Sequence, residues 1–178
     1  MALIATVPPE KAEGKVKKAY DIFLKMGPAV PAPFQMLSAS PDLLEAQAEI
    51  VRYFMGHKTL SFMLLAHIRL LTAVRTGYEF CTNFNAGLLT MMGGVPEEKL
   101  DEVIKDPTKA DLPENEKAML LFVLKAVAEP DSVTEADINK LRGLGWAERD
   151  MFDALVQAAN MVTAGILFRT FKMDDCAF

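Results

Sequence analysis

Cysteine and histidine are scarce in this chain, which has two of each in 178 residues. The cysteines, Cys81 and Cys176, lie too far apart in sequence to suggest a disulfide framework in a chain of this length. Neither they nor the histidines have the spacing of zinc or iron–sulfur ligands. We therefore expect free thiols, no metal site and no bound cofactor.

Basic clusters, a leader segment and long apolar runs are also missing. Nineteen basic against 24 acidic residues give a net charge of −5, and no basic cluster with interleaved aromatic residues occurs, so nucleic acid is not an expected partner. Residues 1–7 lack the basic start and apolar segment of a secretory signal, and no uninterrupted apolar run reaches membrane-spanning length. These absences predict a cytoplasmic protein that does not bind a membrane.

The alternating pattern typical of strands is absent as well, and no internal repeat occurs at a fixed period. Helical periodicity is what the sequence contains, with 51% hydrophobic residues in a chain long enough for one domain with a sizeable core. We expect a single all-α domain with N-terminal helices at 8–56, a core at 60–94 and a C-terminal helical half at 95–178. The proline-rich stretch 27–34 should be a non-helical connector.

The expected core is a pair of helices. Residues 60–75, LSFMLLAHIRLLTAVR, are apolar on nearly every side and predict a central helix. Thr76 and Glu79 have the spacing of a capping box, which places the start of a second helix near Gly77. An apolar stripe with helical spacing should be its buried side. The stripe consists of Phe80, Phe84, Leu88 and Met91.

Cys81 lies on this second helix, with Tyr78 and Asn85 roughly above and below it. A thiol attacks as its thiolate, and free cysteine, with a pKa of about 8.5, is only a few per cent ionised at neutral pH. The helix start would lower that pKa modestly, and Asn85 could hydrogen-bond the sulfur but cannot take its proton. The residues themselves fit either a reactive thiol or a small buried apolar side chain.

Three neighbouring residues also have two interpretations each. His67 on the central helix is either a base near Cys81 or a buried structural histidine. Tyr78 is either a hydrogen-bond donor in a pocket or a space-filling ring. Glu79 is either a helix cap or part of a proton relay.

The pattern from Gly77 to Met92 resembles the core of the alkyl hydroperoxidase D (AhpD) and carboxymuconolactone decarboxylase superfamily, particularly its peroxidase-related single-domain branch. The stretches VPPEKAEGKVKKAYDIF and SPDLLEA are similar to that branch as well. Redox-active members carry a glutamate, eleven residues, and then Cys-x-x-Cys-x-x-x-His. These four positions fall on Ala66, Tyr78, Cys81 and Asn85, so Cys81 alone keeps the family's residue type.

The resemblance implies an AhpD-like domain of about seven helices around a central buried helix pair, assembled as a trimer or hexamer. In the family, the two cysteines cycle between dithiol and disulfide while the glutamate and histidine relay a proton. Here Tyr78 cannot form a disulfide, and neither Ala66 nor Asn85 can carry a proton. The family's cycle cannot run unchanged in this chain.

Three functions therefore stay open. The first is an antioxidant oxidoreductase that reduces a hydroperoxide through Cys81, with an external thiol or Cys176 as its reductant. The second is a decarboxylase- or lactonase-like enzyme that acts on a small organic acid without a thiol, with His67 as the base near Tyr78 and Asn85. The third is a non-catalytic descendant that serves as a binding or assembly module.

Overall fold

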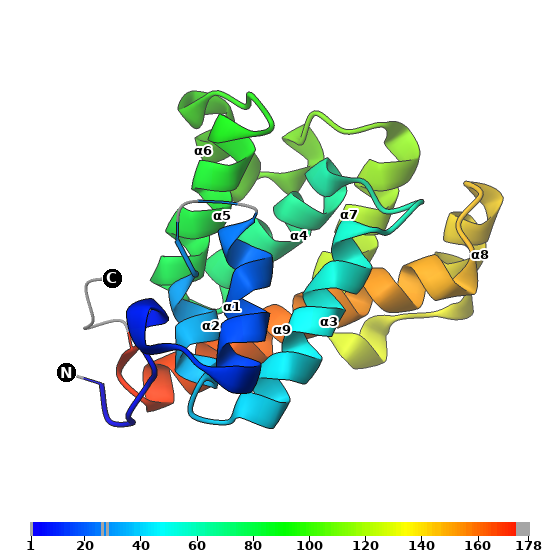
Figure 1. Ribbon diagram of the computed structural model, residues 1–178. Coiled ribbons are helices and arrows are strands. Elements are labelled where there is room, and N and C mark those ends of the chain that lie inside the picture. Colours follow the sequence, from blue (N-terminus) through cyan, green and yellow to red (C-terminus); the bar gives the residue numbers. More distant parts are fainter. Residues whose placement is uncertain (1, 26, 28, 174–178) are drawn as a thin grey trace. The chain divides into compact units, whose positions relative to one another are not determined.

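The computed structural model describes residues 2–25, 27 and 29–173, and this part of the chain is helical (Figure 1). It holds nine α-helices and three short 3-10 helices and no strand, which confirms the all-α class. The elements are η1 Pro9–Lys11, α1 Gly14–Leu24, α2 Ala32–Leu37, α3 Pro41–Met55, α4 Phe62–Arg75, α5 Glu79–Met91, α6 Glu97–Lys105, η2 Pro107–Lys109, α7 Glu114–Ala128, η3 Pro130–Ser132, α8 Glu135–Gly143 and α9 Glu148–Thr170.

The chain divides into two compact units. The first comprises Met1–His57 with Ile166–Phe178, and the second comprises Lys58–Gly165. Helices α1 to α3 belong to the first unit, and α4 to α8 belong to the second, together with α9 as far as Gly165. The organisation as a single domain stays a prediction.

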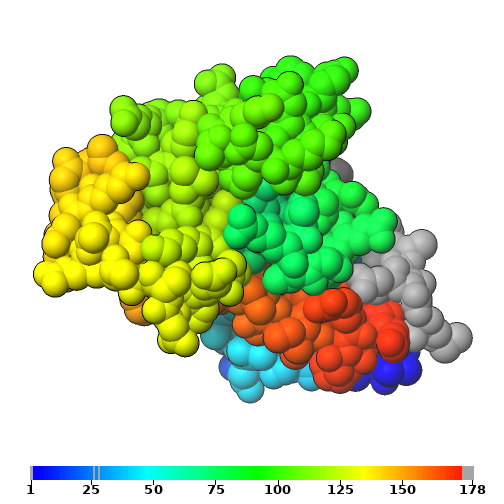
Figure 2. Space-filling model, turned by 180° about the vertical axis from the view of Figure 1, so that it is seen from behind, coloured from blue at the N-terminus to red at the C-terminus, as the bar shows by residue number. Residues whose placement is uncertain are grey.

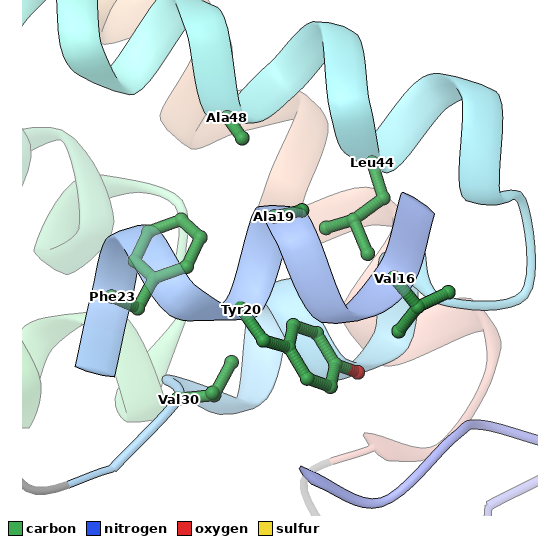
Figure 3. Close-up of a cluster of buried hydrophobic side chains, with 7 residues drawn as sticks. All are labelled: Val16, Ala19, Tyr20, Phe23, Val30, Leu44 and Ala48. Carbon is green, nitrogen blue, oxygen red and sulfur yellow. The ribbon is translucent and has the colours of Figure 1, made fainter. Parts of the chain in front are cut away.

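In the first unit, α1 and α3 share an apolar core (Figure 3). Leu44 and Ala48 of α3 face α1, because residues four apart lie on one side of a helix. The Tyr20 hydroxyl donates a hydrogen bond to the Val7 carbonyl oxygen at 2.8 Å, so this buried ring keeps a partner for its polar atom. The buried members of the cluster are Val16, Ala19, Tyr20, Phe23, Val30, Leu44 and Ala48.

The structure corrects the connector predicted at residues 27–34. Helix α2 begins inside this stretch, at Ala32, with Pro31 as its N-cap and Pro33 in its first turn. The first turn of a helix tolerates proline, since the missing N–H would have no intrahelical acceptor there. A dense run of prolines therefore did not exclude a helix that starts within it.

In the second unit, α4 is the central helix that the sequence predicts. Nine of its 14 residues are buried. Its N-cap, Ser61, accepts a hydrogen bond from the Leu64 amide at 3.0 Å and donates one to Glu116 Oε2 at 2.9 Å. The cap thus fixes the start of α4 and ties it to α7.

Helix α5 shows that the predicted buried stripe was wrong. Its buried residues are Cys81, Asn85 and Leu89, whereas Phe84 is 41% and Met91 88% exposed. Phe80 and Leu88 are half-buried, so the predicted stripe lies partly at the surface. Leu89 packs in a cluster with residues of α4 and α6, so the buried side of α5 is the side that carries Cys81. In Figure 2, the green segment that includes α5 forms part of the molecular surface.

The capping box predicted at the start of α5 was also wrong. Thr76 ends α4 and its hydroxyl donates back to the Thr72 carbonyl at 2.9 Å, so it is not available to cap the next helix. Helix α5 begins at Glu79 with Tyr78 as its N-cap, and no side chain caps it. The intervening Gly77 has a φ of +65°, which glycine adopts readily and which allows the tight turn between the two helices.

Helix α8 begins with a capping box between Thr134 and Asp137. Replacing Thr134 by alanine removes the hydroxyl that donates to Asp137 Oδ2 at 2.9 Å, and we expect the free energy of unfolding to fall by about 1 kcal/mol in urea titrations. Thr163→Ala, at an exposed position of α9, is the matched control and should change stability by less than about 0.5 kcal/mol. Equal losses in the two variants would contradict the capping role.

Acid should weaken the same cap. The Asp137 carboxylate accepts hydrogen bonds from Lys125 Nζ at 2.7 Å and from the Thr134 amide at 2.8 Å. With the Lys125 bond contributing most, these bonds lower the pKa of Asp137 to about 2. The stabilisation is therefore complete above the unfolded pKa of about 3.9 and is lost as the pH falls toward 2. Urea titrations of wild type and Asp137→Asn should differ most near pH 5 and converge near pH 2.

Among the described residues, α9 is the one helix long and apolar enough to cross a membrane. It has 23 residues, and its most apolar window has a mean hydropathy of 1.4 with 33% of that window buried. Core helices of soluble proteins have the same properties, so length and composition alone are weak evidence for a membrane span. The cytoplasmic location stays a prediction.

Candidate thiol site

The four positions that correspond to the family's redox residues are all buried in the second unit. Ala66 lies on α4, Tyr78 caps α5, and Cys81 and Asn85 lie one turn apart on α5. Cys81 is 3% exposed. Helices α4 and α5 pack against each other through residues that include Ala66 and Leu89, and this pairing holds the thiol in the interior.

Asn85 connects Cys81 to a residue that the sequence analysis did not single out. Its Oδ1 accepts a hydrogen bond from Arg69 Nε at 2.8 Å, and its Nδ2 donates to the Cys81 carbonyl oxygen at 2.8 Å. Asn85 therefore bonds the backbone of Cys81, where the sequence had suggested a bond to the sulfur. Both polar ends of the amide are engaged, which fixes its orientation.

Arg69 is a cation that interacts electrostatically with Cys81. Burial lowers the pKa of Arg69 to about 10, and the electrostatic interaction with Cys81 acts in the opposite direction. The guanidinium therefore stays protonated at neutral pH. Because the interaction is mutual, the same charge favours the thiolate of Cys81 over its thiol.

The sequence did indicate that Arg69 needs a polar partner inside the protein. Arg69 is a cation in the middle of a helix that is otherwise apolar on nearly every side, three residues after Ala66 and therefore on the same face as that position. A cation that is partly removed from water requires a polar or charged neighbour. Arg75, the other arginine of α4, is exposed, and its Nη1 donates to the Leu124 carbonyl oxygen at 2.8 Å.

The ring of Tyr78 occupies the space beside α9. A Cβ added at Gly165 would lie 3.3 Å from Tyr78 Cδ1 and 3.4 Å from its Cγ, so the missing side chain of this glycine makes room for the ring. Tyr78 is buried, and its ring fills this space. That its hydroxyl also donates in a pocket stays a prediction.

His67 lies on α4 next to Ala66, but its ring lines a cavity to which Cys81 does not contribute. Its Nδ1 is 2.8 Å from the Met63 carbonyl oxygen, and the ring lines a cavity of about 140 Å³. Tyr78, Cys81 and Asn85 are not among the residues that line this cavity. Burial lowers the pKa of His67, opposed by the Met63 carbonyl and by the charge of Glu116.

The remaining candidates add little to the site. Glu79 is exposed in the first turn of α5. Cys176, the suggested resolving thiol, lies outside the described residues. Within residues 2–25, 27 and 29–173, no three His, Cys, Asp or Glu side chains gather in a way that could hold a metal ion.

Comparison with known proteins identifies the fold. No protein-family model matches the chain, and no curated protein sequence matches it. A structure from Ralstonia eutropha JMP134, described as an alkylhydroperoxidase AhpD core and an uncharacterized peroxidase-related protein, superposes with a TM-score of 0.82 at 21% identity and covers 97% of this chain and 90% of its own. An uncharacterized peroxidase-related protein from Silicibacter sp. TM1040 gives 0.77 at 19% identity, with 96% and 87% covered.

Proposed function

We propose that this chain, which has the AhpD-like fold, reduces hydroperoxides through the single thiol of Cys81. The observation that carries the proposal is the hydrogen-bond chain from the half-buried guanidinium of Arg69 through Asn85 to the Cys81 backbone, together with the electrostatic interaction between Arg69 and Cys81. A cation near a cysteine favours its thiolate, which is the nucleophile. The peroxidase-related proteins of the same fold support the reaction class.

The reaction begins with attack of the Cys81 thiolate on the outer oxygen of the peroxide. A sulfur–oxygen bond forms as the oxygen–oxygen bond breaks, and the sulfur is oxidised to sulfenic acid while the peroxide is reduced to an alcohol or water. The leaving oxygen takes its proton from solvent, since Ala66 and Asn85 offer no acid. Two molecules of an external thiol then restore the enzyme, the first forming a mixed disulfide with release of water and the second releasing Cys81.

Two measurements on the wild-type protein test this function. The rate of Cys81 alkylation by iodoacetamide should follow a pKa below the value of about 8.5 for free cysteine. After one equivalent of hydrogen peroxide, a 1,3-dione reagent for sulfenic acids should add to Cys81, as peptide mass spectrometry would show. Cys81→Ser, which has no thiol at this position, is the negative control for both measurements.

A pKa at or above that of free cysteine, with no sulfenic acid trapped at Cys81, would contradict the proposal and favour a non-catalytic binding or assembly role. The alternative of an organic-acid decarboxylase has less support, because the cavity that His67 lines does not include Tyr78 or Asn85. Assembly as a homo-oligomeric trimer or hexamer stays a prediction, which sedimentation would test.

The burial of Cys81 predicts a preference for small peroxides. A thiol that is 3% exposed admits hydrogen peroxide more easily than a bulky oxidant. We expect cumene hydroperoxide to oxidise Cys81 at least about tenfold more slowly than hydrogen peroxide, after correction by their rates with N-acetylcysteine. Stopped-flow measurement of both oxidants would show this ratio. Equal corrected rates would mean that access to Cys81 is not limited by its surroundings.

A further inference from the structure

A cavity of about 140 Å³ lies in the second unit, bordered by α4, the Gly93-Gly94 turn and α6. Its walls combine apolar side chains with polar ones: Met63, Val95, Pro96 and Val103 are apolar, and His67, Lys99 and Asp111 are polar or charged. The volume is comparable to that of engineered apolar cavities of about 150 Å³, which bind benzene. The cavity is therefore large enough for one ring of six atoms.

One polar side chain gives this cavity a specific chemistry. His67 is 1% exposed, and its Nδ1 lies 2.8 Å from the Met63 carbonyl oxygen. A carbonyl can only accept a hydrogen bond, so Nδ1 carries the proton and Nε2 of the neutral ring is an acceptor. Within the described part of the chain, Nε2 is not one of the fully buried atoms that lack a partner, so water can reach it. A ligand in the cavity can supply the donor in place of water.

The charges around the cavity favour a neutral ligand. Lys99 lines it, but its Nζ already pairs with Glu102 Oε2 at 3.2 Å. Asp111 lines the cavity from an exposed position, where water solvates its carboxylate. An anion would meet this carboxylate, and the paired ammonium offers it little compensation.

We propose that the cavity lined by His67 and Val103 binds a neutral, hydroxylated molecule of about the size of benzene, with its hydroxyl donating to His67 Nε2. The apolar side chains of the walls bury the ring, and the His67 acceptor orients it. The site is separate from Cys81 and does not depend on the function proposed for that thiol.

Phenol and toluene are matched probes for this site, because they have similar size and differ in the hydrogen-bond donor. Phenol should bind wild-type protein with a dissociation constant in the millimolar range and shift the amide signals of Gly93 and Gly94 in NMR spectra. Toluene should bind about tenfold more weakly, since it would exclude water from Nε2 without supplying a hydrogen-bond donor. No saturable shift at these glycines, or equal affinity for the two probes, would overturn the proposal without the need for any variant.

His67→Leu tests the acceptor directly. It should abolish the preference for phenol over toluene while leaving toluene able to bind. His57→Leu, the same substitution at the only other histidine of the sequence, should keep the full preference. A preference that survives in His67→Leu, with circular dichroism showing that the variant is folded, would mean that another group accepts the hydrogen bond.

Discussion

Replacing Arg69 by methionine should slow the alkylation and the peroxide oxidation of Cys81 at pH 7. A cation near an acidic group favours its ionised form, so removal of Arg69 should raise the pKa of Cys81 and reduce its thiolate fraction at pH 7. Methionine keeps much of the volume of the arginine stem, and the pH dependence of the iodoacetamide rate would measure the change. At high pH, where the thiol is fully ionised in both proteins, the two rates should converge.

Two other variants separate the charge from its hydrogen bond. Arg69→Lys retains a cation but loses the Nε donor to Asn85, so it should recover much of the rate. Arg75→Met removes the second arginine of α4, whose partner is the Leu124 carbonyl, and should leave the pKa of Cys81 unchanged. An unaltered alkylation profile in folded Arg69→Met would show that the guanidinium does not activate the thiol.

Gly165→Ala should destabilise the protein by about 1–3 kcal/mol, although alanine is the better helix former. The added methyl group would press against the buried ring of Tyr78, from which it would be 3.3 Å away. In a Tyr78→Ala background the ring is absent, and the same substitution should instead stabilise the protein by about 0.5–1 kcal/mol. Urea titrations of the four proteins in this double-mutant cycle would show the change of sign.

Gly87 provides the matched control, because it lies within α5 and a Cβ added there meets no atom within 4 Å. Gly87→Ala should stabilise the protein in both backgrounds. If Gly165→Ala stabilises the wild-type protein as Gly87→Ala does, the close approach of the Tyr78 ring to α9 is not a constraint on packing.

Most of the helices could be predicted from the sequence, since their ends carry local signals. Ser40-Pro41 marks the start of α3, and Thr134 with Asp137 marks the start of α8. The orientation of α5 could not be predicted, because apolar residues lie on more than one of its sides. Periodicity locates a stripe such as Phe80 and Phe84 without saying whether another helix covers it.

The candidate site was predictable in part. Cys81 and Asn85 do share a buried face of α5, as their spacing indicates. The role of Arg69 depends on a hydrogen bond between residues 16 positions apart on different helices. Spacing within one helix cannot reveal that contact, which arises only when α4 and α5 pack together. The separate surroundings of His67 likewise depend on where α6 and the Gly93-Gly94 turn lie.

The bond between Arg69 and Asn85 has a consequence for how this chain could change. Histidine at position 85 would remove the amide oxygen that accepts from Arg69 and the amide nitrogen that donates to the Cys81 carbonyl oxygen, and one imidazole ring would have to replace both groups with a different geometry. Replacing Arg69 alone would instead leave the amide oxygen of Asn85 without its donor. A change at either position should therefore cost stability unless the other position changes with it.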